Sequence, residues 1–211
     1  SAIFLNGQSI IKNDLINLLN LEENSIEVIN KYNNNSFKSD SIIIGPGSKE
    51  LMLLTNIAFN GDILLPAPSW VSYQPQASIA QNQVHWVQTS SSSNWFPTGE
   101  QIEKKVKSIK NKNILLFLNS PNNPSGTVCK NLEEIAEVAK KYKLVIISDE
   151  IYSNLTFEGN YKSISNFYPQ GTIVSTGLSK WCGAGGWRLG FFAIPDQLKE
   201  LKNSLKTLCS E

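Results

Sequence analysis

Short apolar segments alternate with longer amphipathic ones along most of the chain. The apolar segments are bounded by polar turns and are too short for helices, a pattern typical of strands buried on both faces of a sheet. We predict strands at residues 42–44, 63–65, 84–87, 114–118, 144–148, 172–175 and 190–193.

The segments between these strands have helical spacing. We predict helices at residues 48–60, 70–80, 99–110, 131–142 and 196–208. In the fourth of these, Leu132, Ile135 and Ala139 would lie on one helix face, and Asn131 is placed to cap the helix. Alternation of strands and helices predicts an α/β fold with a mostly parallel sheet.

Composition excludes several classes of protein. The 211 residues are 41% hydrophobic and 18% charged, as in ordinary globular proteins, and the net charge of +1 favours neither a nucleic-acid nor a membrane partner. No apolar run is long enough to span a bilayer, and the first residues do not resemble a signal peptide. The three cysteines are far apart, which fits reduced thiols in the cytoplasm, and no metal site is expected.

Polar, glycine-rich or aromatic segments follow five of the predicted strands. They are residues 45–50 (GPGSKE), 66–70 (PAPSW), 119–126 (NSPNNPSG), 148–152 (SDEIY) and 176–188 (TGLSKWCGAGGWR). Ligands of such sheets bind at the carboxyl ends of the strands, so these segments are expected to form one shared site.

Two of these segments suit an anion and a nucleophile. Lys180 lies in a glycine-rich loop. In a pocket that is partly shielded from water, its ammonium would lose its proton more easily, and the amine would be a nucleophile toward an aldehyde. The alternative is that Lys180 is an ordinary solvated charge. Arg188 is the only arginine, and a guanidinium binds phosphate or carboxylate through two parallel hydrogen bonds. The turn at Gly47, Ser48 and Lys49 leads into a predicted helix, whose N-terminus attracts anions.

The other segments suit a flat, charged ring. Asp149 ends a buried strand and needs a cation, such as a protonated pyridine nitrogen, unless it caps a turn. Tyr152 could reach the same ring, and Trp70 offers a face for stacking or is a core aromatic. The Asn123 amide could donate to a phenolic oxygen or form a turn.

Together these segments resemble the class I/II aminotransferases of fold type I, in the order and spacing of their motifs. The resemblance rests on residues 47–50 (GSKE), 66–73 (PAPSWVSY), 120–126 (SPNNPSG), 148–152 (SDEIY) and 178–180 (LSK) with Arg188 eight residues later. It covers about residues 41–193 and implies the three-layer α/β/α large domain of aspartate aminotransferase-like enzymes. Residues 41–211 would be that pyridoxal-phosphate-binding domain, and residues 1–40 a partial N-terminal segment.

The resemblance also implies pyridoxal 5'-phosphate as cofactor and a role for each residue. Lys180 would form the Schiff base and carry the substrate proton, and Asp149 would pair with the pyridinium. Tyr152 and Asn123 would bind the phenolic oxygen, and Trp70 would stack on the ring. The phosphate would lie among Gly47, Ser48, Lys49, Ser179 and Arg188. At Gly177 many members of the family carry a phosphate-binding serine, so one contact would be missing.

The resemblance implies an enzyme that transfers an amino group from an amino acid to a 2-oxo acid and forms a homodimer at full length. Family members are about twice as long and have a small C-terminal domain with a second arginine, so the chain is expected to be a fragment that is poorly active alone. A fold type I carbon–sulfur lyase or synthase shares these motifs, and a non-catalytic sensor domain is a further alternative.

Overall fold

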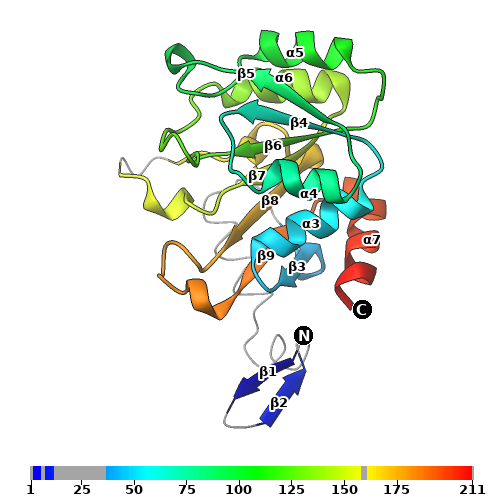
Figure 1. Ribbon diagram of the computed structural model, residues 1–211, viewed down its shortest axis with the longest axis vertical. Coiled ribbons are helices and arrows are strands. Elements are labelled where there is room, and N and C mark those ends of the chain that lie inside the picture. The colour runs from blue at the N-terminus through cyan, green and yellow to red at the C-terminus, as the bar shows by residue number, and fades with distance from the viewer. Residues whose placement is uncertain (1, 6–7, 12–36, 158–160, 211) are drawn as a thin grey trace.

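The computed structural model describes residues 2–5, 8–11, 37–157 and 161–210 (Figure 1). Within the N-terminal segment, β1 (Ala2–Leu5) and β2 (Gln8–Ile11) pair antiparallel, and neither strand was predicted. Tyr32, to which the sequence assigned no role, lies outside the described residues.

A seven-stranded sheet forms the centre of the chain. Its strands are β3 (Ile42–Gly45), β4 (Asp62–Ala67), β5 (Val84–Gln88), β6 (Ile114–Asn119), β7 (Val145–Asp149), β8 (Thr172–Gly177) and β9 (Gly190–Ala193). Their order in the sheet is β3-β9-β8-β7-β6-β4-β5. Strands β8, β7, β6, β4 and β5 are parallel, whereas β9 runs antiparallel to both β3 and β8. The prediction of a mostly parallel sheet is therefore confirmed.

In the part of the chain that the structure describes, five helices cover the sheet. They are α3 (Ser48–Ala58), α4 (Tyr73–Ile79), α5 (Gly99–Ser108), α6 (Leu132–Tyr142) and α7 (Lys199–Ser210). Short 3-10 turns occur at Ser39–Ser41, Ser91–Ser93, Ser153–Leu155, Ile164–Asn166, Pro169–Gly171, Gly185–Trp187 and Asp196–Leu198. Every predicted helix is present, but α4 begins three residues later than predicted, and a 3-10 turn occupies the predicted start of α7.

Local capping explains one helix start and fails to explain another. At α5, Thr98 accepts from the Gln101 backbone N–H while the Gln101 side chain accepts from the Thr98 N–H, a complete capping box. Asn131 lies at the N-cap of α6 as predicted, yet its side chain does not cap the helix. Its Oδ1, the atom that would cap the helix, accepts from the Cys129 thiol at 3.3 Å, and its Nδ2 donates to the carbonyl oxygen of Pro97 at 2.9 Å.

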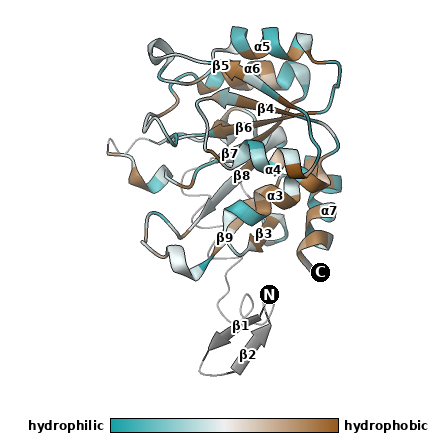
Figure 2. Cartoon of the chain, viewed as in Figure 1, coloured by the Kyte–Doolittle hydropathy of each residue, from teal (hydrophilic) through white to brown (hydrophobic). Residues whose placement is uncertain are grey.

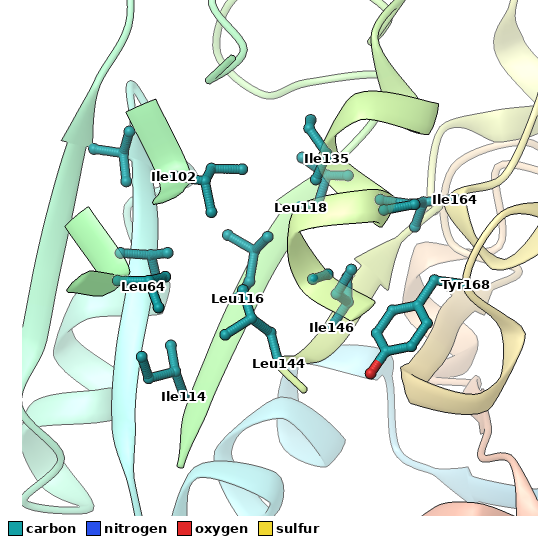
Figure 3. Close-up of a cluster of buried hydrophobic side chains, with 14 of the residues drawn as sticks. Leu64, Ile102, Ile114, Leu116, Leu118, Ile135, Leu144, Ile146, Ile164 and Tyr168 are labelled. Atoms are coloured by element: carbon teal, nitrogen blue, oxygen red, sulfur yellow. The ribbon is translucent and has the colours of Figure 1, made fainter. Parts of the chain in front are cut away.

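Alternate residues of the central strands point to opposite faces of the sheet. Leu116 on β6 packs in a cluster with residues of α5 and α6, and Figure 3 shows this cluster. Its neighbour Leu115 packs in a second cluster with residues of α3, α4 and α7. The helices show an apolar and a polar side in Figure 2, as helices that cover a sheet must. The chain therefore has three layers, with the sheet in the middle.

The strand register aligns the functional segments at one edge of the sheet. Asn119, Asp149 and Ser175 are register partners at the carboxyl ends of β6, β7 and β8. Because β9 is antiparallel, its first residue, Gly190, lies at the same edge and pairs with both Gly45 and Gly177. The antiparallel strand thus brings the start of α3 next to the loop that carries Lys180.

Candidate active site

A pocket of about 230 Å³ opens at this edge of the sheet. Every site residue proposed from the sequence lines it: Gly47, Ser48, Lys49, Trp70, Asn123, Asp149, Tyr152, Ser179, Lys180 and Arg188. Asn119 and Ile151 complete the lining. The volume lies below the range of about 300–1,000 Å³ that is usual for ligand pockets, so the pocket suits a small ligand.

Asp149 is the buried anionic group of the pocket. The residue is 4% exposed, and the Tyr73 hydroxyl donates to its Oδ2 at 2.6 Å. The Ile151 backbone N–H approaches Oδ1 at 3.4 Å. Burial raises the pKa of the Asp149 carboxyl to about 6, and these two hydrogen bonds oppose the rise. Within the described ranges no lysine or arginine forms an ion pair with Asp149, so a cation bound in the pocket would find an unpaired carboxylate.

Side chains from three other segments face the same space. The Asn123 amide nitrogen lies 3.4 Å from the Tyr152 hydroxyl oxygen. The exposed Lys180 ammonium lies 5.8 Å from the centre of the Tyr152 ring. Trp70 is half-buried and meets the Tyr73 ring edge to face, with ring centres 5.4 Å apart. A primary amine, a phenol, an amide and an indole therefore surround one small space.

The opposite end of the pocket is built for an anion. Gly47 is the N-cap of α3, no side chain caps this helix, and the Gly47 φ of 94° favours glycine. Arg188 is exposed and donates to the carbonyl oxygens of Gly185 and Pro46 at 3.0 and 3.4 Å. A Cβ on Gly190 would lie 2.0 Å from the Ser48 nitrogen, so glycine permits this close approach of β9 to α3. A helix N-terminus and a guanidinium thus face one point from two sides.

The glycine at position 177 also has a structural reason. A Cβ there would lie 2.6 Å from the carbonyl oxygen of Leu189. The close pairing of β8 with β9 therefore leaves no room for a side chain at position 177.

Two residues of the site were missed by the sequence analysis. Tyr73 lies three positions after Trp70, and its hydroxyl donates a hydrogen bond to the Asp149 carboxylate. Asn119 is the last residue of β6, buried and polar. A polar residue at the carboxyl end of a buried strand was a usable signal for Asn119. No local pattern indicates that Tyr73 contacts a carboxylate 76 positions away.

A second buried carboxylate lies outside the pocket. Glu150 is 3% exposed and accepts from the hydroxyls of Ser148, at 2.8 Å, and of Ser163. Burial raises the pKa of the Glu150 carboxyl to about 7. Because Ser148 lies in β7 and Ser163 in the segment after it, this carboxylate ties that segment to the strand.

The chain also has a larger groove, of about 910 Å³, beside the start of α6. Glu133, Glu134 and Glu137 lie on its wall with Lys130 and Lys162. None of the residues proposed from the sequence lines it. The smaller pocket, which combines an amine, a buried acid and an anion site, is therefore the candidate active site.

Comparison with known proteins gives a consistent result. Residues 13–210 match the model of the family described as aminotransferase class I and II. The chain is 34% identical over 182 residues to the aspartate aminotransferase of Bacillus sp. (strain YM-2), which covers 82% of the chain and 46% of that protein. It is also 34% identical to aromatic-amino-acid aminotransferase 2 of Thermococcus litoralis, over 88% of the chain and 49% of that protein. The chain thus spans about half the length of these relatives.

Solved structures agree with the observed fold. The aspartate aminotransferase of Thermus thermophilus with maleate superposes with a TM-score of 0.80 at 29% identity, over 90% of the chain and 50% of that structure. The fold alone is shared with the aspartate aminotransferase from Rhizobium meliloti, with a TM-score of 0.83 at 23% identity, over 90% of the chain and 48% of that structure. By sequence and by fold, the chain belongs to the class I and II aminotransferase family, with the fold type I architecture.

Proposed function

We propose that this chain is the cofactor-binding domain of a pyridoxal-phosphate-dependent aminotransferase and that Lys180 is the residue that binds the cofactor covalently. The observation that carries the proposal is the single pocket shared by Lys180, Asp149 and Arg188, of which Asp149 comes from a different segment than the other two. The names of the relatives support it, since those compared are aspartate and aromatic-amino-acid aminotransferases. Under this proposal residues 41–211 form the cofactor domain and residues 1–40 an N-terminal segment.

The residues of the pocket fit this cofactor. The unpaired, buried Asp149 carboxylate requires a cation, and a protonated ring nitrogen supplies one. The anion site between Gly47 and Arg188 suits a phosphate at the other end of the ring. When bound, pyridoxal phosphate supplies an electron sink that stabilises negative charge at the substrate α-carbon.

Each side chain of the pocket has a separate role in this proposal. The Asp149 carboxylate, kept ionised by the Tyr73 hydroxyl, keeps the proton on the ring nitrogen. The Lys180 amine would accept the proton from the substrate α-carbon and hold it for return. Asn123 and Tyr152 would donate hydrogen bonds to the phenolic oxygen of the cofactor, and the Trp70 indole would stack on its ring. Gly47, Ser48, Lys49, Ser179 and Arg188 would hold its phosphate and so keep the ring within reach of Lys180.

The partners follow from the same proposal. The substrates are an amino acid and a 2-oxo acid, and neither nucleic acid nor membrane takes part. In the described part of the chain no helix has the length and apolar character to cross a bilayer. We propose a cytoplasmic homodimer for the full-length enzyme. The chain's only arginine belongs to the proposed anion site, so within this chain a substrate carboxylate would be bound by groups other than a second arginine.

The test is covalent labelling of the 211-residue chain with pyridoxal phosphate and borohydride, followed by peptide mass mapping. We expect a single reduced adduct on Lys180 that Lys180→Ala abolishes. The control, Lys199→Ala, removes an exposed lysine outside the pocket and should leave the adduct unchanged. Labels scattered over surface lysines would contradict the proposal. Product analysis with candidate amino acids then separates transamination from a lyase or synthase reaction.

A further inference from the structure

Asn119 connects the two segments that hold opposite edges of the proposed ring site. Its Oδ1 accepts a hydrogen bond from the Asn123 backbone N–H at 2.7 Å. Its Nδ2 donates to the Asp149 backbone carbonyl oxygen at 2.9 Å. The residue is 6% exposed, so neither bond competes much with water.

The two partners determine which way the side-chain amide points. A backbone N–H can only donate and a carbonyl oxygen can only accept, so the Asn119 oxygen must face Asn123 and its nitrogen must face Asp149. A side chain of this length needs both a donor and an acceptor to make both contacts. Leucine has the same shape but neither group, and serine is too short to reach both partners.

Besides the Asn119 side chain, the Ser120 backbone N–H ties this loop to β7, because it donates to the Asp149 carbonyl oxygen at 3.3 Å. The hydrogen bonds from Asn122 N–H to the Thr127 carbonyl and from Gly126 N–H to the Asn122 carbonyl lie within the loop itself. The contact between the Asn123 amide and Tyr152 is long, at 3.4 Å. The register pairing of Asn119 with Asp149 and the Ser120 bond hold the start of the loop, and the Asn119 side chain extends this connection to Asn123.

We propose that Asn119 is a positioning residue that sets the spacing between the Asp149 carboxylate and the Asn123 amide, and so the fit of the cofactor ring between them. This inference rests on the proposed function. Asn119 acts through its two neighbours, because its polar atoms are already bonded to their backbones. Loss of its side-chain amide therefore misplaces both ring-binding groups at once.

The test compares Asn119→Leu with wild type in two measurements on the same chain. The first is the dissociation constant of pyridoxal phosphate, and the second is the pH midpoint of the visible absorbance of the lysine-linked cofactor. Since a buried hydrogen bond contributes about a factor of five to an equilibrium, loss of two disfavours the binding-competent arrangement by about 25-fold, and affinity should weaken by up to that factor. The midpoint should shift as well, because the Asn123 amide and the Asp149 carboxylate both set the charge on the ring.

Asn56→Leu is the matched control. Asn56 is also a fully buried asparagine whose Nδ2 donates to a backbone carbonyl, that of Met52 at 2.8 Å. It lies near the far end of α3 and does not line the pocket. This variant should lose stability but keep the affinity and the pH midpoint of wild type. Asn119→Ser, which is smaller and can satisfy one partner at most, repeats the test if Asn119→Leu does not fold.

The outcomes separate the two proposals. If wild type forms no adduct on Lys180, the proposed function fails, and this inference fails with it. If wild type binds the cofactor and the Asn119 variants match it in affinity and midpoint, only the positioning role is refuted. An affinity loss equal to that of Asn56→Leu with an unmoved midpoint would also refute it, because general destabilisation would then explain the loss.

Discussion

Replacing Tyr73 with phenylalanine tests how the protein keeps Asp149 ionised. The variant removes one hydroxyl, which donates to Asp149 Oδ2 at 2.6 Å. It keeps the aromatic ring, which packs against Phe117 with ring centres 4.8 Å apart. The change is therefore confined to the hydrogen bond, because the core around the ring is preserved.

The size of the effect follows from the burial of the pair. Asp149 already has a pKa raised to about 6 by burial, and the Tyr73 hydroxyl opposes that rise. A hydrogen bond to a charged group contributes about 1.5–3 kcal/mol, which corresponds to a pKa change of roughly 1–2. In Tyr73→Phe the Asp149 pKa should therefore rise to about 7–8. At neutral pH much of the carboxyl would then be protonated and unable to pair with a ring cation.

The assay is the affinity for pyridoxal phosphate measured as a function of pH. In wild type, binding should weaken as the pH falls through about 6, because Asp149 takes up a proton that must leave on binding. In Tyr73→Phe the same weakening should begin at a higher pH. Tyr142→Phe is the control, since it removes a tyrosine hydroxyl that contacts Glu103 at 2.7 Å outside the pocket. Identical pH profiles for Tyr73→Phe and wild type would refute this account of Asp149.

Two further variants test the buried acid and the anion site. Because the folded protein holds the Glu150 proton up to a pKa of about 7 against an ordinary value of 4.5, wild type should lose stability as the pH rises between these values. The loss in the free energy of unfolding should be at most about 3 kcal/mol, and Glu150→Gln should lack it. Urea unfolding of both proteins at pH 4.5 and 7.5 measures this difference, and an equal loss in wild type and variant would contradict the prediction. In Gly47→Ala the new Cβ would lie 2.4 Å from Arg188 Nη2, so affinity for pyridoxal phosphate should fall at least about tenfold by titration. Gly126→Ala also has a positive φ but meets no atom within 4 Å, so an equal loss there would remove the steric explanation.

Local patterns in the sequence were sufficient for the central sheet, the helices that cover it and most of the residues that line the pocket. Strand β9 begins and ends where its apolar pattern predicts, at Gly190–Ala193. Lys180 and Asp149 were identified because polar residues after buried strands in a parallel sheet meet at one edge. Such inferences succeed because side-chain periodicity and the position of strand ends depend on neighbouring residues alone.

The tertiary structure decided which contacts the residues of the site make with one another. Tyr73 and Asp149 are 76 positions apart, and only packing of α4 against the sheet brings the hydroxyl to the carboxylate. The antiparallel insertion of β9 between β3 and β8 brings Arg188 to the start of α3. Asn119 likewise acquires its partners from the register of β6 with β7 and from the turn that follows. The sequence by itself determined which chemical groups reach the site. Their contacts depend on long-range packing, and no short stretch of the chain encodes that packing.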